Sequence, residues 1–222
     1  MHSSKGFVRL DACMADDLSV VNSARVSFAK HSEELDDAGV GLIGFLMRER
    51  HGTPFEHNAF RFHIKCPVFV AREWFRHRIG SFNEFSARYS EVGDEFYLPE
   101  LENVRTQVGK PGSYSFEEME PSDAAAAKAI LQTSMERSFS AYRALLKMDV
   151  AKELARTVLP TSMYTEFYWT VNARALMNFL SLRTAMTAQL EIREYAEDVE
   201  AIFAEQMPVT YKWWKKHGKV AP

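Results

Sequence analysis

Residues 163–183 constrain the fold of this chain more than any other stretch. The first part, 163–171, consists mainly of β-branched and aromatic residues, which favour an extended strand. Asn172 then stands where a helix N-cap is expected, because its short side chain can accept a hydrogen bond from the first helical turn. The following helix, which ends at Arg183, is apolar nearly all round, so we expect it to be buried. A strand leading directly into a buried helix is typical of a mixed α/β fold.

Hydrophobic periodicity and turn residues predict the other elements. Strands are expected at 6–14, 55–65 and 95–99, and helices at 41–50, 68–78, 122–148, 150–159 and 189–206. A further helix, N-capped by Asp16 or Asp17, is expected to run through Ala24. The segment after Gly80 is interpreted as a loop, and 103–115 as a flexible loop or lid. No repeat, low-complexity tract or composition shift divides the sequence, so one domain over residues 1–222 is predicted.

Composition excludes several classes of protein. The 27 Lys and Arg residues against 30 Asp and Glu residues give a net charge of −3, which argues against a general nucleic-acid binder. The two cysteines imply no disulfide framework and fit a reducing compartment. No apolar run is long enough to span a bilayer, and residues 1–9 do not resemble a signal peptide. We therefore expect a cytoplasmic protein without a membrane partner.

The densest polar chemistry lies in the run 76–89, which carries three guanidiniums and an imidazole but no lysine. Arginine binds phosphate and carboxylate groups bidentately, because its planar fork matches two oxygens. A solvated surface loop is the plain alternative, since charged residues are usually exposed. An anion-binding site is the sharper interpretation.

Arg174 and Asn178 lie four residues apart and therefore share one face of the expected helix. A buried guanidinium needs an anion or several hydrogen-bond acceptors, because its desolvation costs several kcal/mol. An internal glutamate or a bound ligand could each satisfy this requirement, and the sequence leaves both open.

Other chemistries receive little support. His51, His57 and His63 are spaced six apart, which matches no short zinc motif, so no metal site is predicted. Cys66 precedes an expected helix start but has no assigned histidine partner, so a buried thiol is favoured over a nucleophile. Ser86 lacks a Gly-x-Ser-x-Gly turn. Neither a Walker loop nor Gly-x-Gly-x-x-Gly is present, so arginines would have to hold any nucleotide phosphates.

The run 76–89 matches R-H-R-x-x-S-x-N-E-x-S-x-R-Y, the signature of the flavin-dependent thymidylate synthases, at all nine fixed positions. Residues 51–57 resemble the family's H-x-T-P-F-E-H segment. Residues 171–174, with Asn178 and 182–183, resemble its V-N-A-R…N…L-R helix, and 25–28 also fits. The similarity covers most of the chain in the same order.

The resemblance implies the reductive methylation of dUMP to dTMP. Methylenetetrahydrofolate would donate the carbon, FAD would carry the hydride, NADPH would reduce the FAD, and no enzyme cysteine would be needed. It also implies a single mixed α/β domain of antiparallel sheet with long helices. The family forms homotetramers in which several subunits build each active site.

The resemblance further assigns residues to the two ligands. Those expected to bind FAD are Thr53, Glu56, Arg76, His77, Arg78, Glu84, Asn172, Arg174 and Asn178. Those expected to bind dUMP are Glu73, Arg76, Glu84, Ser86, Ala87, Arg88, Arg156 and Arg183. Arg183 is the expected catalytic residue, because a fixed positive charge would stabilise the electron-rich uracil ring.

Two positions depart from the pattern of some relatives. Glu73 stands where some carry Gln, and a carboxylate near a phosphate-bearing substrate would be repulsive unless neutralised. Thr187 stands where some carry a His near the flavin.

A nucleotide- or RNA-binding protein is the alternative from another class. Arg76, Arg78 and Arg88 would contact phosphates, with Phe82 or Tyr89 stacking on bases. The net negative charge counts against this alternative.

Overall fold

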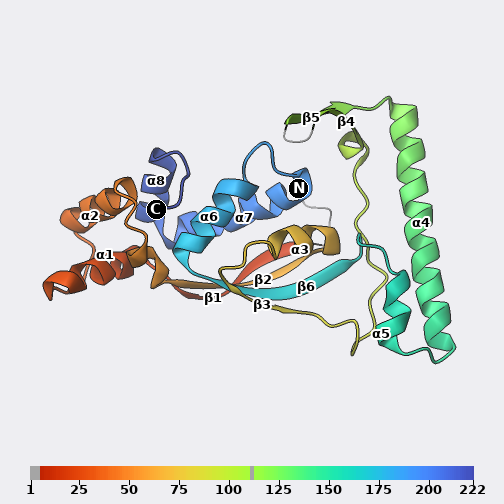
Figure 1. Ribbon diagram of the computed structural model, residues 1–222, viewed down its shortest axis with the longest axis horizontal. Coiled ribbons are helices and arrows are strands. Elements are labelled where there is room, and N and C mark those ends of the chain that lie inside the picture. The colour runs from red at the N-terminus through yellow and green to blue at the C-terminus, as the bar shows by residue number, and fades with distance from the viewer. Residues whose placement is uncertain (1–5, 111–112) are drawn as a thin grey trace. The chain divides into compact units, whose positions relative to one another are not determined.

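A four-stranded sheet with the strand order β1-β2-β6-β3 forms the framework of the computed structural model, which describes residues 6–110 and 113–222 (Figure 1). The strands are β1 Phe7–Met14, β2 Ala59–Pro67, β3 Ser81–Glu84, β4 Arg105–Lys110, β5 Ser113–Glu118 and β6 Tyr164–Val171. The α-helices are α1 Asp17–Arg25, α2 Asp37–Arg48, α3 Val68–Trp74, α4 Pro121–Lys147, α5 Lys152–Ala155, α6 Ala173–Arg183, α7 Leu190–Gln206 and α8 Pro208–Lys216. The predicted mixed α/β class is confirmed.

The chain divides into two compact units made of interleaved segments. Unit 1 contains Gly6, Lys65–Arg72 and Glu84–Glu166, and unit 2 contains Phe7–Ile64, Glu73–Asn83 and Phe167–Pro222. Strands β2, β3 and β6 and helix α3 each contribute residues to both units. The chain passes repeatedly between the two units, so neither unit is one continuous stretch of sequence. One domain over residues 1–222 stays a prediction.

An aromatic layer forms the core of unit 2. Helix α6 contributes Phe179, which stacks on Trp74 with ring centroids 4.7 Å apart and lies 5.0 Å from Trp169 of β6. Phe60 of β2 contacts Phe203 of α7 edge to face, with ring centroids 6.1 Å apart. Helices α6 and α7 thus cover one face of the sheet strands (Figure 1). Offset and edge-to-face ring pairs stabilise a core beyond simple burial.

Helix α8 is capped by a residue from the far end of the sequence. Asp17, which is buried, accepts hydrogen bonds from the backbone N–H groups of Val209 and Thr210, both at 2.8 Å, and from the Thr210 hydroxyl at 2.6 Å. These N–H groups lie in the first turn of the helix, where intrahelical acceptors are lacking. Asp16, one residue earlier, caps α1 itself by accepting from Ser19 N–H at 2.6 Å.

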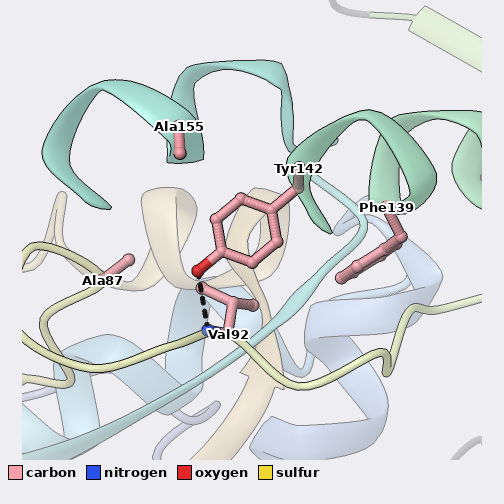
Figure 2. Packing of buried hydrophobic residues seen from close by; sticks show 5 residues of the cluster. All are labelled: Ala87, Val92, Phe139, Tyr142 and Ala155. Atoms are coloured by element: carbon pink, nitrogen blue, oxygen red, sulfur yellow. Dashed lines mark hydrogen bonds between the residues drawn. The ribbon is translucent and has the colours of Figure 1, made fainter. Parts of the chain in front are cut away.

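Unit 1 is built around the long helix α4. Its Phe139 and Tyr142 pack with Ala87, Val92 and Ala155 in a buried cluster (Figure 2). The Val92 backbone N–H donates a 3.1 Å hydrogen bond to the Tyr142 hydroxyl. This contact ties the segment that follows β3 to α4.

The expected loop or lid at 103–115 is wrong for most of its length. Strands β4 and β5 pair antiparallel there, with Gln107 opposite Phe116 and Gly109 opposite Tyr114. The Arg105 guanidinium lies 4.8 Å from the Phe116 ring centroid. Both strands are largely exposed, so no buried face produced an apolar alternation in the sequence. Positions 111 and 112 of the expected loop lie outside the described residues.

Several boundaries also differ from the prediction. The helix expected at 68–78 ends at Trp74, and part of the expected loop after Gly80 is strand β3. The helix expected at 150–159 is reduced to α5 and a short 3₁₀ turn. Helix α4 starts at Pro121, one residue before the expected start, and its N-cap residue Glu120 makes no side-chain cap hydrogen bond. Pairing within the sheet decided the extent of β3, and the geometry of proline decided the start of α4. The local hydrophobic pattern of the sequence records neither effect.

Two glycines of α2 provide a matched test of packing. A Cβ on Gly44 would lie 2.5 Å from the nearest ring atom of Trp213 on α8, whereas a Cβ on Gly41 would meet nothing within 4 Å. We expect Gly44→Ala to destabilise the protein by about 1–3 kcal/mol through overpacking. Gly41→Ala should stabilise it by about 0.5–1 kcal/mol, because glycine costs conformational entropy in a helix. Urea unfolding measures both; equal effects would contradict the packing of α2 against α8.

Candidate functional site

A cavity of about 720 Å³ lies in unit 2 beside α6 and the segment that follows α3. Seven of the nine residues expected to bind FAD line it: Glu56, Arg76, His77, Arg78, Asn172, Arg174 and Asn178. Thr53 is exposed one turn from Glu56 and does not line the cavity, and Glu84 belongs to unit 1. The sequence run 76–89 is therefore divided after Asn83.

One face of α6 forms a wall of this cavity. Asn172 caps the helix by accepting a 2.8 Å hydrogen bond from Ala175 N–H, as predicted. The expected burial of α6 is only partly confirmed, because Arg174, Asn178 and Leu182 are exposed at intervals of four residues. Its other faces, which carry Phe179, pack in the aromatic core. The polar pair thus faces a cavity rather than the core.

Both alternatives that the sequence left open for Arg174 remain compatible with its surroundings. Its Nη1 donates to the Glu56 carboxylate at 2.6 Å, so an internal glutamate is indeed a partner. The side chain is nevertheless 46% exposed and lines the cavity, so a ligand can also reach it. Surface-accessible ion pairs of this kind contribute little to stability.

Arg183 lines the same cavity and is held by the residues around the end of α3. Its Nε donates to His77 Nε2 at 3.0 Å, and its Nη1 lies 3.2 Å from the Glu73 carboxylate. Its Nη2 also donates to the Glu73 backbone oxygen at 3.5 Å. The Glu73–Arg183 pair thus neutralises the carboxylate that was expected to repel an anionic substrate.

The electrostatics of this group favour a neutral imidazole. Burial, together with the Arg183 guanidinium, lowers the pKa of His77 to about 4. Accepting a hydrogen bond at Nε2 also requires that nitrogen to be unprotonated. Burial raises the pKa of the Glu73 carboxyl, while Arg183 opposes this shift and Glu191 adds to it.

Most of the other residues expected to bind dUMP lie in unit 1. Ala87 is buried in the cluster under α4 (Figure 2), and Ser86 and Arg88 flank it. Arg88 Nε lies 3.6 Å from the Glu153 carboxylate, and Arg156 Nε donates to the Glu153 backbone oxygen at 3.4 Å. The structure therefore gathers two exposed arginines around one residue that the sequence reasoning did not single out.

Glu84 is hydrogen-bonded within the protein, and the two cysteines differ in burial. The Thr165 hydroxyl donates to Glu84 Oε1 at 2.8 Å. Cys66 is fully buried in β2, and burial raises the pKa of its thiol well above the usual value, with Glu84 adding to the shift. Cys13 is exposed. The expected buried state of Cys66 is confirmed.

Neither a metal cluster nor a membrane helix is found in the described part of the chain. Within 6–110 and 113–222, no three His, Cys, Asp or Glu side chains are grouped to hold a metal ion. The helices of these ranges are too short or too polar to cross a bilayer.

Sequence reasoning missed the apolar and C-terminal lining of the cavity. Ile79, Ala175, Leu182, Ala221 and Pro222 all contribute to it. Ala175 and Leu182 follow the helical spacing of Arg174 and Asn178, so periodicity could have found them. Nothing local indicates that 221–222 return to α6.

The cavity in unit 2 is lined by four arginines, Arg76, Arg78, Arg174 and Arg183, a residue type suited to bind anions through paired hydrogen bonds. The family described as thymidylate synthase complementing protein matches residues 9–209. The chain is 49% identical to the flavin-dependent thymidylate synthase of Thermosipho melanesiensis, over 96% of this chain and 91% of that protein. It is 44% identical to a flavin-dependent thymidylate synthase of Thermus thermophilus, over 96% of this chain and 77% of that protein.

A solved structure agrees with these sequence matches. The UMP/dUMP methylase PolB from Streptomyces cacaoi, bound with 5-Br dUMP, superposes with a TM-score of 0.91 and 43% identity. The match covers 99% of this chain and 98% of that one. The chain belongs to the flavin-dependent thymidylate synthases, a family of enzymes.

The depressed pKa of His77 makes a testable contribution to acid sensitivity. Between its ordinary value of 6.5 and about 4, the unfolded chain binds a proton at His77 that the folded protein does not. Stability from this group is therefore complete above pH 6.5 and is lost as the pH falls toward 4. We expect His77→Gln to lose less unfolding free energy between about pH 7 and about pH 5 than the parent protein.

Urea unfolding at both pH values measures this difference. His31→Gln, which removes an imidazole from an exposed position, is the control. An unaltered pH dependence in His77→Gln would contradict the neutral, half-buried imidazole.

Proposed function

We propose that this enzyme methylates dUMP to dTMP with FAD as its bound cofactor. The observation that carries the proposal is the cavity in unit 2, where seven residues of the expected FAD set meet. The relatives named flavin-dependent thymidylate synthase, over nearly the whole chain, support the same activity.

The residues of the cavity fit FAD chemically. Arg76, Arg78 and Arg174 supply guanidiniums for a diphosphate, which arginine binds through paired hydrogen bonds. Ile79 and Leu182 are exposed apolar side chains of the lining, suited to contact a ring system. When bound, FAD supplies the hydride that completes the new methyl group.

Arg183 is proposed to stabilise the electron-rich uracil ring during carbon transfer. Its guanidinium already has fixed partners in Glu73 and His77, so little reorganisation is needed when charge develops. Arg88 and Arg156 are proposed to bind dUMP, and both are exposed residues of unit 1. Ser86, Ala87 and Glu84 belong to the same proposed set.

A cysteine nucleophile has no role in this proposal. Burial of Cys66 and its raised pKa keep the group as a thiol rather than the reactive thiolate. Flavin-supplied hydride makes such a nucleophile unnecessary.

The remaining parts of the proposal follow from the family resemblance. Methylenetetrahydrofolate donates the carbon, and NADPH reduces the flavin. Homotetramers assemble sites from several subunits, and the enzyme works in the cytoplasm.

UMP is a second candidate substrate. The neighbouring PolB is described as a UMP/dUMP methylase, and its structure with 5-Br UMP matches this chain with a TM-score of 0.91 and 42% identity. Parallel assays of UMP and dUMP, with detection of the methylated nucleotide, decide between the two.

We expect the purified protein to bind FAD and to oxidise NADPH faster when dUMP and methylenetetrahydrofolate are present. Arg183→Ala should lose dTMP formation by about two orders of magnitude or more, because a preorganised charge is removed. Arg48→Ala is the control, since Arg48 is exposed and its ion pair is with its sequence neighbour Glu49. A protein that acquires no flavin spectrum with FAD would refute the proposed function.

Removal of Arg88 tests the proposed dUMP contact separately. Arg88→Ala should weaken dUMP binding by about 1.5–3 kcal/mol, the usual loss for a hydrogen bond to a charged group. Arg143→Ala is a matched control in unit 1, because Arg143 is equally exposed and pairs with Asp94. Calorimetric titration of dUMP measures both variants; equal affinity in the parent and Arg88→Ala would exclude this role.

A further inference from the structure

Arg174 is held from two sides at the edge of the flavin cavity. Its Nη1 donates to the Glu56 carboxylate at 2.6 Å, and its Nε donates to the backbone oxygen of Pro222 at 2.7 Å. Within residues 6–110 and 113–222, Nη2 of Arg174 has no hydrogen-bond partner. The guanidinium is thus oriented by two contacts while one of its amino groups stays available on the cavity.

The segment 219–222 is itself anchored. Lys219 Nζ forms a 2.7 Å ion pair with Glu200 of α7, and its backbone N–H donates to the Trp214 oxygen at 2.9 Å. The Ser181 hydroxyl of α6 donates to the Lys219 backbone oxygen. Pro222 is buried and, together with Ala221, lines the cavity. The segment therefore presents its backbone oxygen to Arg174 from a fixed position.

Gly52 makes room for this arrangement. A Cβ at this position would lie 2.4 Å from Arg174 Nε and 2.8 Å from the Pro222 oxygen. Both distances are far below ordinary contact, so even an alanine would displace the guanidinium from its place. The missing side chain of Gly52 thus leaves room for the hydrogen bond between Arg174 and the Pro222 oxygen.

We propose that residues 219–222 position Arg174 for the anionic part of the flavin, through the Pro222 backbone oxygen. This inference rests on the proposed function, because FAD is taken as the ligand of the cavity. A side chain held in its binding geometry loses less conformational entropy when the ligand arrives, so the contact strengthens binding. Without it, the guanidinium is free to rotate toward Glu56 alone.

Deletion of residues 220–222 tests the proposal in the full protein. We expect the dissociation constant for FAD to rise by roughly threefold to tenfold, the range for one immobilised side chain. Lys212→Ala is the control and should bind FAD as the parent does, because Lys212 is exposed on α8 and does not line the cavity. Flavin fluorescence titration measures the affinity, and circular dichroism checks that each variant is folded.

A second variant leaves the segment intact. Gly52→Ala should raise the FAD dissociation constant to a similar extent, because the new methyl group displaces Arg174. If deletion of 220–222 fails to fold, Gly52→Ala still tests the same contact. Unchanged affinity in a folded Gly52→Ala or deletion variant overturns the proposal.

A double-mutant cycle distinguishes two roles of residues 220–222, the positioning of Arg174 and a direct contact with FAD. In an Arg174→Ala background, deletion of 220–222 should cause no further loss of FAD affinity. An equal loss in both backgrounds would show that the segment contacts the ligand itself, and the positioning role would be wrong. Failure of the parent protein to bind FAD would instead refute the proposed function, so the two failures are distinguishable.

Discussion

The stacking of Phe179 on Trp74 is the interaction on which the candidate site depends. It joins α6 to the end of α3, with ring centroids 4.7 Å apart, and Trp169 of β6 packs against both rings. His77, three residues beyond Trp74, also contacts the Phe179 ring at 4.9 Å. Because these large rings are buried and leave few alternative arrangements, they fix where the residues after α3 meet the residues of α6.

The polar groups of the cavity depend on that rigid contact. Arg183 reaches both Glu73 and His77 because α6 and α3 are held in one register by the aromatic layer. Because residues four apart lie on the same face of a helix, Arg174 and Asn178 of α6 both line the cavity. In each case a guanidinium is oriented by fixed protein acceptors, and such preorganisation is what an anion-binding or catalytic site requires.

Local sequence patterns predicted those parts of the fold in which neighbouring residues interact. Asn172 was identified as the α6 cap because its partner, Ala175, is three residues away. Partners that lie far apart in sequence left no comparable pattern. Asp17 caps α8, which lies more than 190 residues further along the sequence. Strand β3 forms because it pairs with β6 in the sheet, although the sequence 81–84 resembles a loop. The β4–β5 hairpin was missed because it has no buried face.

The sequence by itself determined the mixed α/β class, the family signature in the run 76–89 and most residues of the cavity. These features are encoded in residue types at fixed short spacings. Only the tertiary structure decided the partners of those residues: Glu56 and Pro222 for Arg174, Glu73 and His77 for Arg183, and Glu153 for Arg88 and Arg156. Long-range hydrogen bonds depend on how packed elements meet, and no local spacing records that geometry.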